Sequence, residues 1–336
     1  MEAITTTLRG LEIGQPQQFR NLTAFPLLHR DADSPAYITL SRAIQNKTAK
    51  ITEISEGGSI PELLLNNTGE ENILILDGEE LLGAKQNRIT NLTILAAANS
   101  KTVLPVSCVE AGRWGYRSAE FKVSSRTMFQ RGRATKAAAL SENLKATGTY
   151  GADQSMVWDD ISDKQERMSV HSETDAMADM YDQHHDQVED YAQSFTTVTN
   201  QVGVLFAIDG EVEGMDLFDA PQTMEAMLPK LTRGFAIDAL ETEGQTTKAA
   251  ELQTVSRFLD RIAAAHADSY PGVGLGTDIR LSGPLVAGGA LVYEDSLVHL
   301  AAFGRQGPQS PGIRSSDETR LRARRYDRMR RRDQDH

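Results

Sequence analysis

The residues best suited to chemistry are concentrated in one stretch, Ile73–Trp114. This segment combines carboxylates, cations, two amides, the only cysteine of the chain and an indole. Few purely structural segments need such a mixture, so we predict that the functional centre lies here. The candidate side chains are Asp77, Glu79, Lys85, Gln86, Asn87, Arg88, Cys108, Glu110, Arg113 and Trp114.

Two carboxylates, Asp77 and Glu79, flank a glycine directly after the apolar run ILIL. Two carboxylates held close together can bind a divalent cation, or raise the pKa of one of them for acid–base catalysis. The alternative is that Asp77 stabilises a turn, as aspartate before glycine often does, while Glu79 faces solvent. Glu110 is a further candidate base or metal ligand. The sequence leaves these alternatives open.

The cations Lys85, Arg88 and Arg113 predict recognition of an anion such as phosphate. Guanidinium groups bind phosphate through paired N–H donors, and lysine adds a point charge. Between the first two of these cations lie Gln86 and Asn87, whose amides can hydrogen-bond to a sugar or a base edge. Together they predict a site for a phosphorylated ligand.

Cys108 lies in a predicted strand, Val103–Glu110, on the same face as Glu110. A neighbouring carboxylate raises the pKa of a thiol, and reactive thiolates usually have a base or cation beside them. We therefore expect Cys108 to be a buried structural residue more readily than a nucleophile. Trp114 either stacks on a planar ligand or fills the core.

The composition is that of a soluble globular protein: of 336 residues, 40% are hydrophobic and 24% charged. No run approaches the ~18 apolar residues of a membrane helix. The N-terminus lacks the pattern of a signal peptide, and a single cysteine agrees with a reducing compartment, so we expect a cytoplasmic protein. The net charge of −12 argues against general binding to nucleic acid or to anionic membranes.

The end of the chain, residues 305–336, has a different character. It is rich in arginine and poor in large aliphatic residues, so we expect a mobile tail. Such a tail either keeps the protein soluble or binds RNA or an acidic partner.

Hydrophobic patterning predicts an α+β fold, with residues 1–304 forming one compact domain. Residues 1–125 contain short apolar runs separated by turn residues, typical of strands. Residues 126–199 follow a helical period. Residues 200–304 return to strands and helices, including a helix from Pro221 to about Leu240 capped by Asp219. A second helix is predicted at about 248–267, followed by three strands.

Two segments share a pattern, ILILDGEELLG around Asp77 and LFAIDGEVEG around Asp209. Each has an apolar run, Asp-Gly-Glu and then another glycine. A pseudo-duplicated βα unit would explain the match, and so would the frequent use of Asp-Gly in turns.

The motifs LDGEELLGAKQNR and PVSCVEAGRW together resemble a bacterial family named for its association with ADP-ribosylglycohydrolases and rhodanese-phosphatases. QSMVWDDI at 154–161, QVGVLFAIDGEVEGMDLFD at 201–219 and GVGLGTDIRL extend the resemblance to about residue 304. The resemblance implies a role in NAD and ADP-ribose metabolism. It also places the candidate site on the residues of the first two motifs.

Two functions follow. In the first, the protein binds, and hydrolyses or transfers, an ADP-ribose-like or other phosphorylated nucleotide ligand. The cations would then neutralise phosphate, Glu79 or Glu110 would serve as base or as ligand to a divalent cation, and Trp114 would stack. In the second, the protein is a non-catalytic scaffold or ligand sensor whose QNR and GRW motifs form a partner interface, where Arg and Trp are frequent hot spots.

Overall fold

The computed structural model describes residues 1–30, 36–54, 61–83, 85–113, 118–244 and 250–305. Met1–Gly304 form one compact unit. The predicted mobile tail and Trp114 lie outside the described residues, as does the start of the helix predicted at 248–267. Within the described part, several sheets and helices alternate along the chain, which confirms the predicted α+β class.

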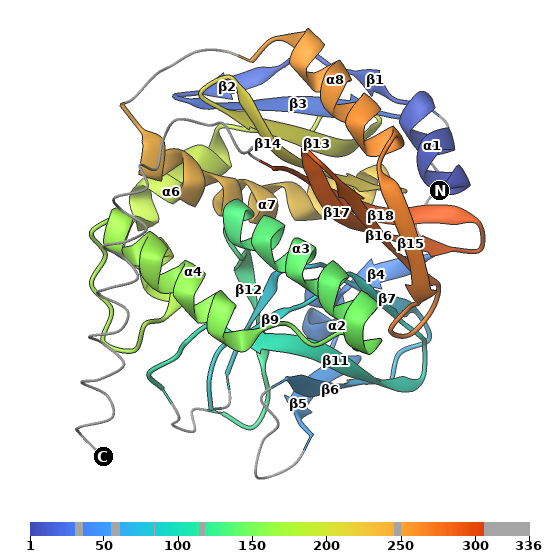
Figure 1. Ribbon diagram of the computed structural model, residues 1–336. Helices are drawn as coiled ribbons and strands as arrows, with labels where there is room; N and C mark the ends of the chain where they lie inside the picture. Colours follow the sequence, from blue (N-terminus) through green and yellow to red (C-terminus); the bar gives the residue numbers. More distant parts are fainter. Residues whose placement is uncertain (31–35, 55–60, 84, 114–117, 245–249, 306–336) are drawn as a thin grey trace. The chain divides into compact units, whose positions relative to one another are not determined.

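A nine-stranded sheet unites the two ends of the compact unit (Figure 1). Its order is β1-β3-β13-β14-β18-β17-β16-β15, with β2 paired to β3, and every pairing in it is antiparallel. Strands from the first β-rich part and from the last part therefore share one sheet. The strands are β1 (Glu12–Ile13), β2 (Gln17–Phe19), β3 (Leu22–Leu28), β13 (Gln201–Ile208), β14 (Glu211–Phe218), β15 (His266–Pro271), β16 (Thr277–Gly283), β17 (Val286–Tyr293) and β18 (Ser296–Gly304).

Two smaller sheets are built from the remaining strands. One has the order β12-β8-β9-β11-β6-β5 and the other β10-β7-β4, in which β4 and β7 run parallel. The central strand β7 is buried after its first residue, which agrees with its unbroken apolar run. The strands are β4 (Tyr37–Thr39), β5 (Ala49–Glu53), β6 (Glu62–Asn67), β7 (Asn72–Ile75), β8 (Glu79–Leu82), β9 (Arg88–Thr90), β10 (Ile94–Ala96), β11 (Ser100–Cys108) and β12 (Lys122–Thr127).

The two Asp-Gly turns have different surroundings. Asp209-Gly210 closes the hairpin between β13 and β14. Asp77-Gly78 instead carries the chain from β7 in the three-stranded sheet to β8 in the six-stranded sheet. Neither turn leads directly into a helix, so the two segments do not form a repeated βα unit.

Helices cover both faces of the nine-stranded sheet (Figure 1). On one face, α1 and α8 share a hydrophobic cluster with the sheet. On the other, α7 packs against β13 and α6, and α3 contacts β16, β17 and β18. The predicted helix at 248–267 is shorter than expected, because the chain leaves α8 at Ala263 and pairs as β15 from His266. The helices are α1 (Glu2–Arg9), α2 (Leu40–Gln45), α3 (Gln130–Thr147), α4 (Gln154–Arg167), α5 (Met177–Gln183), α6 (His185–Gln193), α7 (Pro221–Thr242) and α8 (Leu252–Ala263).

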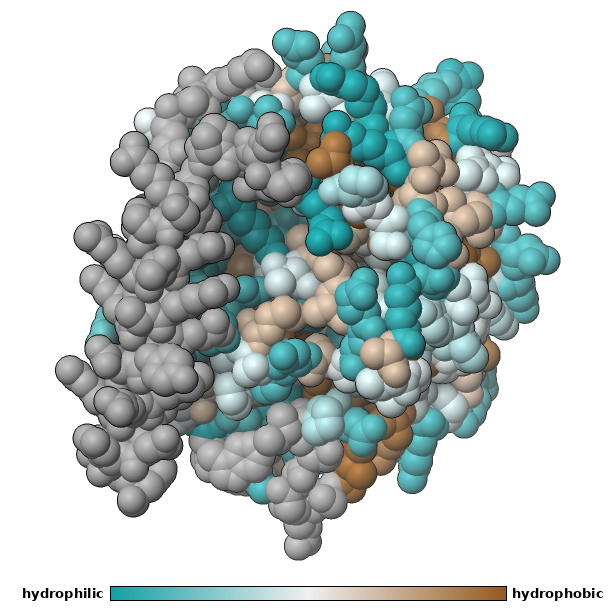
Figure 2. Space-filling model, viewed as in Figure 1, coloured by the Kyte–Doolittle hydropathy of each residue, from teal (hydrophilic) through white to brown (hydrophobic). Residues whose placement is uncertain are grey.

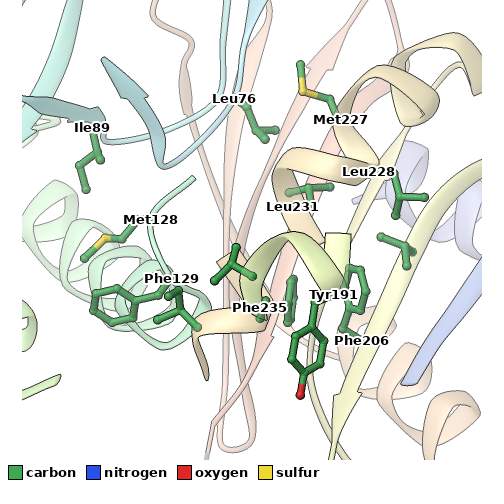
Figure 3. Close-up of a cluster of buried hydrophobic side chains, with 14 of the residues drawn as sticks. Leu76, Ile89, Met128, Phe129, Tyr191, Phe206, Met227, Leu228, Leu231 and Phe235 are labelled. Atoms are coloured by element: carbon green, nitrogen blue, oxygen red, sulfur yellow. The ribbon is translucent and has the colours of Figure 1, made fainter. Parts of the chain in front are cut away.

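The hydrophobic core anchors both ends of the first polar motif. Figure 2 shows a face on which the described residues are largely hydrophilic, whereas the hydrophobic side chains gather inside (Figure 3). Leu76 and Ile89 belong to the same cluster as Phe206 and Phe235, whose ring centroids lie 4.3 Å apart. Asp77 follows the first of these residues and Arg88 precedes the second. Core packing therefore fixes where the motif begins and ends.

The start of α7 differs in detail from the prediction. Pro221 occupies the first turn, as expected, but the N-cap is Ala220 and no side chain caps the helix. Asp219 instead accepts a hydrogen bond from the hydroxyl of Tyr37 in β4. The Asp219 carboxylate, which we expected to cap the helix, is thus bound by a residue distant in sequence.

Helix α3 buries charged residues that tie the sheets together. Lys136 donates to Asp77 and to the carbonyls of Thr90 and Asn91, at 3.0 and 2.8 Å in the two carbonyl bonds. One turn earlier, Arg133 donates to both carboxylate oxygens of Asp216 in β14, and its Nε lies 3.4 Å from Asp77. The Asp-Gly turn is therefore fixed to α3 by buried ion pairs.

We predict that Lys136→Met lowers the free energy of unfolding by about 3–5 kcal/mol, because the buried Asp77 carboxylate loses its hydrogen-bonded cation and keeps only Arg133 at 3.4 Å. The carbonyls of Thr90 and Asn91 also lose a buried donor. Urea denaturation measures the change. The control is Lys50→Met, which removes a lysine whose side chain is 61% exposed in its pair with Glu120 and should change stability by about 0.5 kcal/mol or less. Equal effects of the two variants would contradict the structural role of Lys136.

We also predict a pH effect at Asp219, since burial raises the pKa of this carboxyl to about 6 even though the hydrogen bond from Tyr37 lowers it. In the unfolded chain the pKa is about 3.9. The folded protein therefore keeps a proton that the unfolded chain has lost, and this contribution to stability declines as pH rises from about 4 to 6. The free energy of unfolding of Asp219→Asn minus that of wild type should therefore increase by about 2–3 kcal/mol as pH rises from 4 to 7. Urea denaturation at the two pH values measures this difference. A difference that stays constant over this range would refute the raised pKa.

Candidate functional site

The two polar motifs of the sequence meet where β9 pairs with β11. Arg88 and Cys108 are directly opposite in the antiparallel register, so their side chains point to the same face of the sheet. Beside this pair, Gln86 donates to the carbonyl of Glu110 at 2.9 Å. The backbone N–H of Asn87 donates to the Glu110 carboxylate at 3.2 Å. We call this group the Arg88 cluster; its members are Gln86, Asn87, Arg88, Cys108, Glu110 and Arg113.

Glu110 and Arg113 form a buried ion pair. A guanidinium nitrogen of Arg113 lies 2.6 Å from the Glu110 carboxylate and also donates to the Asn87 side chain at 3.2 Å. The hydroxyl of Thr174 donates to the other carboxylate oxygen at 3.3 Å. Glu110 is thus a structural acceptor that closes the cluster, and its charge is neutralised.

Arg88 is bonded much less completely. Its side chain is 0% exposed, and Nη1 donates to Oε1 of Gln86 at 3.1 Å. Among the described residues, Nε and Nη2 have no hydrogen-bond partner, and no carboxylate lies within the 4 Å of an ion pair. Arg88 therefore places a buried positive charge with two vacant donor nitrogens in the cluster.

Helix α4 forms another wall of the cluster. Gln154 binds both backbone groups of Cys108: its Oε1 accepts the N–H at 2.7 Å and its Nε2 donates to the carbonyl at 2.8 Å. Trp158 follows one helical turn later, on the same side of α4, and its N–H is close enough to affect the thiol. The candidate site residues chosen from the two polar motifs included neither Gln154 nor Trp158. Only the QSMVWDDI motif of the family resemblance contained them.

The Cys108 thiol has a raised pKa. Burial is the main cause, and a hydrogen bond to the Glu110 carbonyl, the charge of Arg88 and the Trp158 N–H each oppose it in part. Sγ lies 3.5 Å from the Glu110 carbonyl oxygen, to which the thiol donates. At neutral pH the group is a protonated thiol lining the cluster, without the thiolate that a nucleophile requires.

Asp77 and Glu79 do not act together. Asp77 pairs with Lys136, whereas Glu79 pairs with Lys230 of α7 at 2.5 Å and accepts the Leu76 N–H at 3.1 Å. Each carboxylate therefore has its own buried cation. Within the described ranges, no group of three or more His, Cys, Asp or Glu side chains is arranged to hold a metal ion. Lys85 directly precedes Gln86 in the sequence, and this residue is partly exposed.

A buried hydroxyl–imidazole–carboxylate series lies elsewhere. Nδ1 of His299 is 2.8 Å from the Thr93 hydroxyl, and Nε2 is 3.2 Å from Asp216. This order resembles a nucleophilic triad. However, Asp216 is held by Arg133, which with His299 lowers its pKa to about 2 although burial acts in the opposite direction. The Thr93 hydroxyl also accepts the Asp77 N–H. All these groups are buried and hydrogen-bonded. The series therefore connects the nine-stranded sheet, which contains Asp216 and His299, to Thr93 beside β10 of the three-stranded sheet.

A cleft of about 310 Å³ lies between β12, α6 and α7, apart from the Arg88 cluster. Its cations are compensated: Arg126 pairs with Glu80 and Asp182, and Arg233 pairs with Glu189. The cleft contains none of the residues predicted to form the site.

Comparison with known proteins agrees with the motifs. No curated protein and no solved structure matches the chain. In the part of the chain that the structure describes, no helix is both long enough and apolar enough to cross a membrane. The model of one family, described as the ARG and Rhodanese-Phosphatase-superfamily-associated Protein domain, matches residues 10–303. The chain therefore belongs to this family.

Proposed function

We propose that the protein binds an anionic, phosphate-bearing ligand of the ADP-ribose type, with Arg88 as the central contact. The observation that supports this is the buried guanidinium with two vacant nitrogens. Removing an ion from water costs several kcal/mol unless a partner compensates it. Arginine cannot avoid this cost by losing its proton, since its pKa is above about 12. A bound anion would supply the missing compensation.

The geometry of the vacant nitrogens suits an oxyanion. Nε and Nη2 project from the same edge of the planar guanidinium, whereas Nη1, on another edge, is held by Gln86. Two parallel N–H donors match two oxygens of one phosphate or carboxylate group. Gln86 thus fixes the orientation of the fork, and the edge with Nε and Nη2 has no hydrogen-bond partner among the described residues.

The family name supports the choice of ligand class. It refers to an association with ADP-ribosylglycohydrolases and rhodanese-phosphatases, and ADP-ribose carries a pyrophosphate that an arginine fork can bind. The predicted bases Glu79 and Glu110 are both paired with cations. Binding is therefore better supported than hydrolysis or transfer.

The alternative of a partner interface is less well supported. Interface hot spots must reach the surface in the free protein, but Arg88 is 0% exposed and Arg113 only 9%. A non-catalytic sensor that binds the same ligand fits the geometry equally well, because it needs the site without a reactive group.

We predict opposite effects of Arg88→Met on stability and on binding. Without ligand, the free energy of unfolding should stay the same or rise by about 1–2 kcal/mol, because an apolar side chain of similar size replaces a buried unpaired charge. With ADP-ribose at about 100 times its Kd, wild type should gain about 2.7 kcal/mol and the variant nothing. Urea denaturation with and without ligand measures both quantities.

Arg30→Met is the matched control, since this side chain is 75% exposed in its pair with Glu12. It should bind ADP-ribose as wild type does. If Arg88→Met instead destabilised the free protein by several kcal/mol, Arg88 would be a structural residue. If no phosphorylated ligand stabilised wild type, the proposed function would be wrong.

For the thiol, we predict that Cys108→Ser keeps ligand affinity within about threefold, because Cys108 is a protonated wall residue and the hydroxyl can donate to the same Glu110 carbonyl. Isothermal titration with ADP-ribose tests this, together with turnover if a reaction is found. A loss of several orders of magnitude in turnover with folding intact would identify the thiol as a nucleophile.

A further inference from the structure

Helix α4 brings a further unpartnered donor to the Arg88 cluster. Nε1 of Trp158 is buried and has no hydrogen-bond partner among the described residues. Gln154, one turn earlier, bonds both backbone groups of Cys108. Residues four apart lie on the same side of a helix, so the contact of Gln154 also brings the indole to Cys108. Burial raises the pKa of the Cys108 thiol and the Trp158 N–H partly opposes this, which agrees with an indole beside the sulfur.

Arg88 reaches the same sulfur from strand β9. It is directly opposite Cys108 in the pairing of β9 with β11, and such residues have Cβ atoms about 5 Å apart. Nε and Nη2 of Arg88 and Nε1 of Trp158 are therefore three buried N–H donors beside one thiol, each without a hydrogen-bond partner in the described part of the chain. Buried donors without a partner are rare and cost free energy. Their grouping around one residue indicates the place of an acceptor.

We propose that the indole N–H of Trp158 is a third donor to the anion bound by Arg88, so that the site takes a tetrahedral oxyanion, such as a phosphate or pyrophosphate, in preference to a planar carboxylate. The inference rests on the proposed function and adds to it a further binding residue. The fork of Arg88 occupies two oxygens of one group. A carboxylate has no third oxygen for the indole, whereas a phosphate or pyrophosphate has one.

The chemistry of the indole suits this role. Its N–H donates and the ring has no acceptor atom, so only an acceptor can satisfy it. The thiol does not do so, because it donates to the Glu110 carbonyl at 3.5 Å and forms no hydrogen bond with Nε1. Hydrogen bonds to an ionised oxygen are about twice as strong as those between neutral groups. An anion held by Arg88 is therefore a better acceptor for Trp158 than the sulfur is.

The test compares the full chain with its Trp158→Phe variant, which removes the N–H and keeps an aromatic ring. In isothermal titration with ADP-ribose, the variant should lose affinity by about tenfold or more, because a hydrogen bond to a charged oxygen is lost. Thermal shift with inorganic phosphate and with acetate, at constant ionic strength, tests the class of ligand. The variant should weaken phosphate by about fivefold or more and acetate by about twofold or less, because acetate has no third oxygen for the indole.

Tyr191→Phe is the matched control, because it also removes a buried donor from an aromatic side chain. The hydroxyl of Tyr191 has a partner, Oδ1 of Asn21 at 2.7 Å, and it does not belong to the Arg88 cluster. This variant should lose stability in urea denaturation and bind ADP-ribose within about twofold of wild type, since separate sites act independently. Equal losses of affinity in the two variants would overturn the role of Trp158.

A spectroscopic measurement on the wild-type chain does not depend on how a variant folds. The sequence has two tryptophans, so a proton–nitrogen NMR spectrum contains two indole signals. Either Trp158→Phe or Trp114→Phe identifies the signal of Trp158. Saturation with inorganic phosphate should move this proton downfield, because a hydrogen bond to an anion deshields it. A tryptophan with a purely structural role would keep its chemical shift.

The outcomes separate this inference from the proposed function. If ADP-ribose and phosphate bind wild type and Trp158→Phe equally, or if the indole proton does not move, the role of Trp158 is wrong and the proposed function stands. If acetate is weakened as much as phosphate, the preference for a tetrahedral group is wrong. If neither ADP-ribose nor phosphate binds wild type, the proposed function itself fails.

Discussion

Charge compensation in the interior is the constraint on which the rest of the structure depends. Lys136, Lys164 and Lys230 come from three different helices, and each meets a carboxylate, on Asp77, Asp238 and Glu79 respectively. A buried lysine without such a partner would lose its charge or destabilise the fold. These pairs therefore dictate how α3, α4 and α7 dock. Among the buried lysines and arginines of the described residues, Arg88 stands apart because no carboxylate accompanies it.

The Asp-Gly turn shows how this constraint acts on the chain. Asp77 turns toward α3, Glu79 toward α7, and the next residue, Glu80, pairs with Arg126 of β12. Successive residues of a strand face opposite sides, so one short acidic segment can bind three neighbouring elements. Asp77 and Glu79, which the sequence pattern suggested as catalytic, are each paired with a buried lysine in the structure. They hold β8 and β9 in place, and β9 carries Arg88.

Local patterns predicted the elements whose signals are local. The apolar run ILIL lies largely in strand β7, and Pro221 begins a helix. The three strands predicted after the second helix are β16, β17 and β18. The failures arose where a distant contact decided the outcome. The hydroxyl of Tyr37 donates to Asp219, which was expected to cap a helix. Residues from His266 onward, expected to be helical, pair with β16 as a strand. Neither partner is visible in a local window.

The sequence by itself determined which residue types would gather around the Asp-Gly turn and the single cysteine, because hydrophobic runs and turn residues fix where strands begin and end. It also carried the family motifs. Only the tertiary structure decided which charges cancel. Arg88 and Arg113 look equivalent along the chain, yet Arg113 meets Glu110 and Arg88 meets the neutral side chain of Gln86. Compensation depends on distances of a few ångströms between residues far apart in sequence, and a linear pattern does not contain those distances.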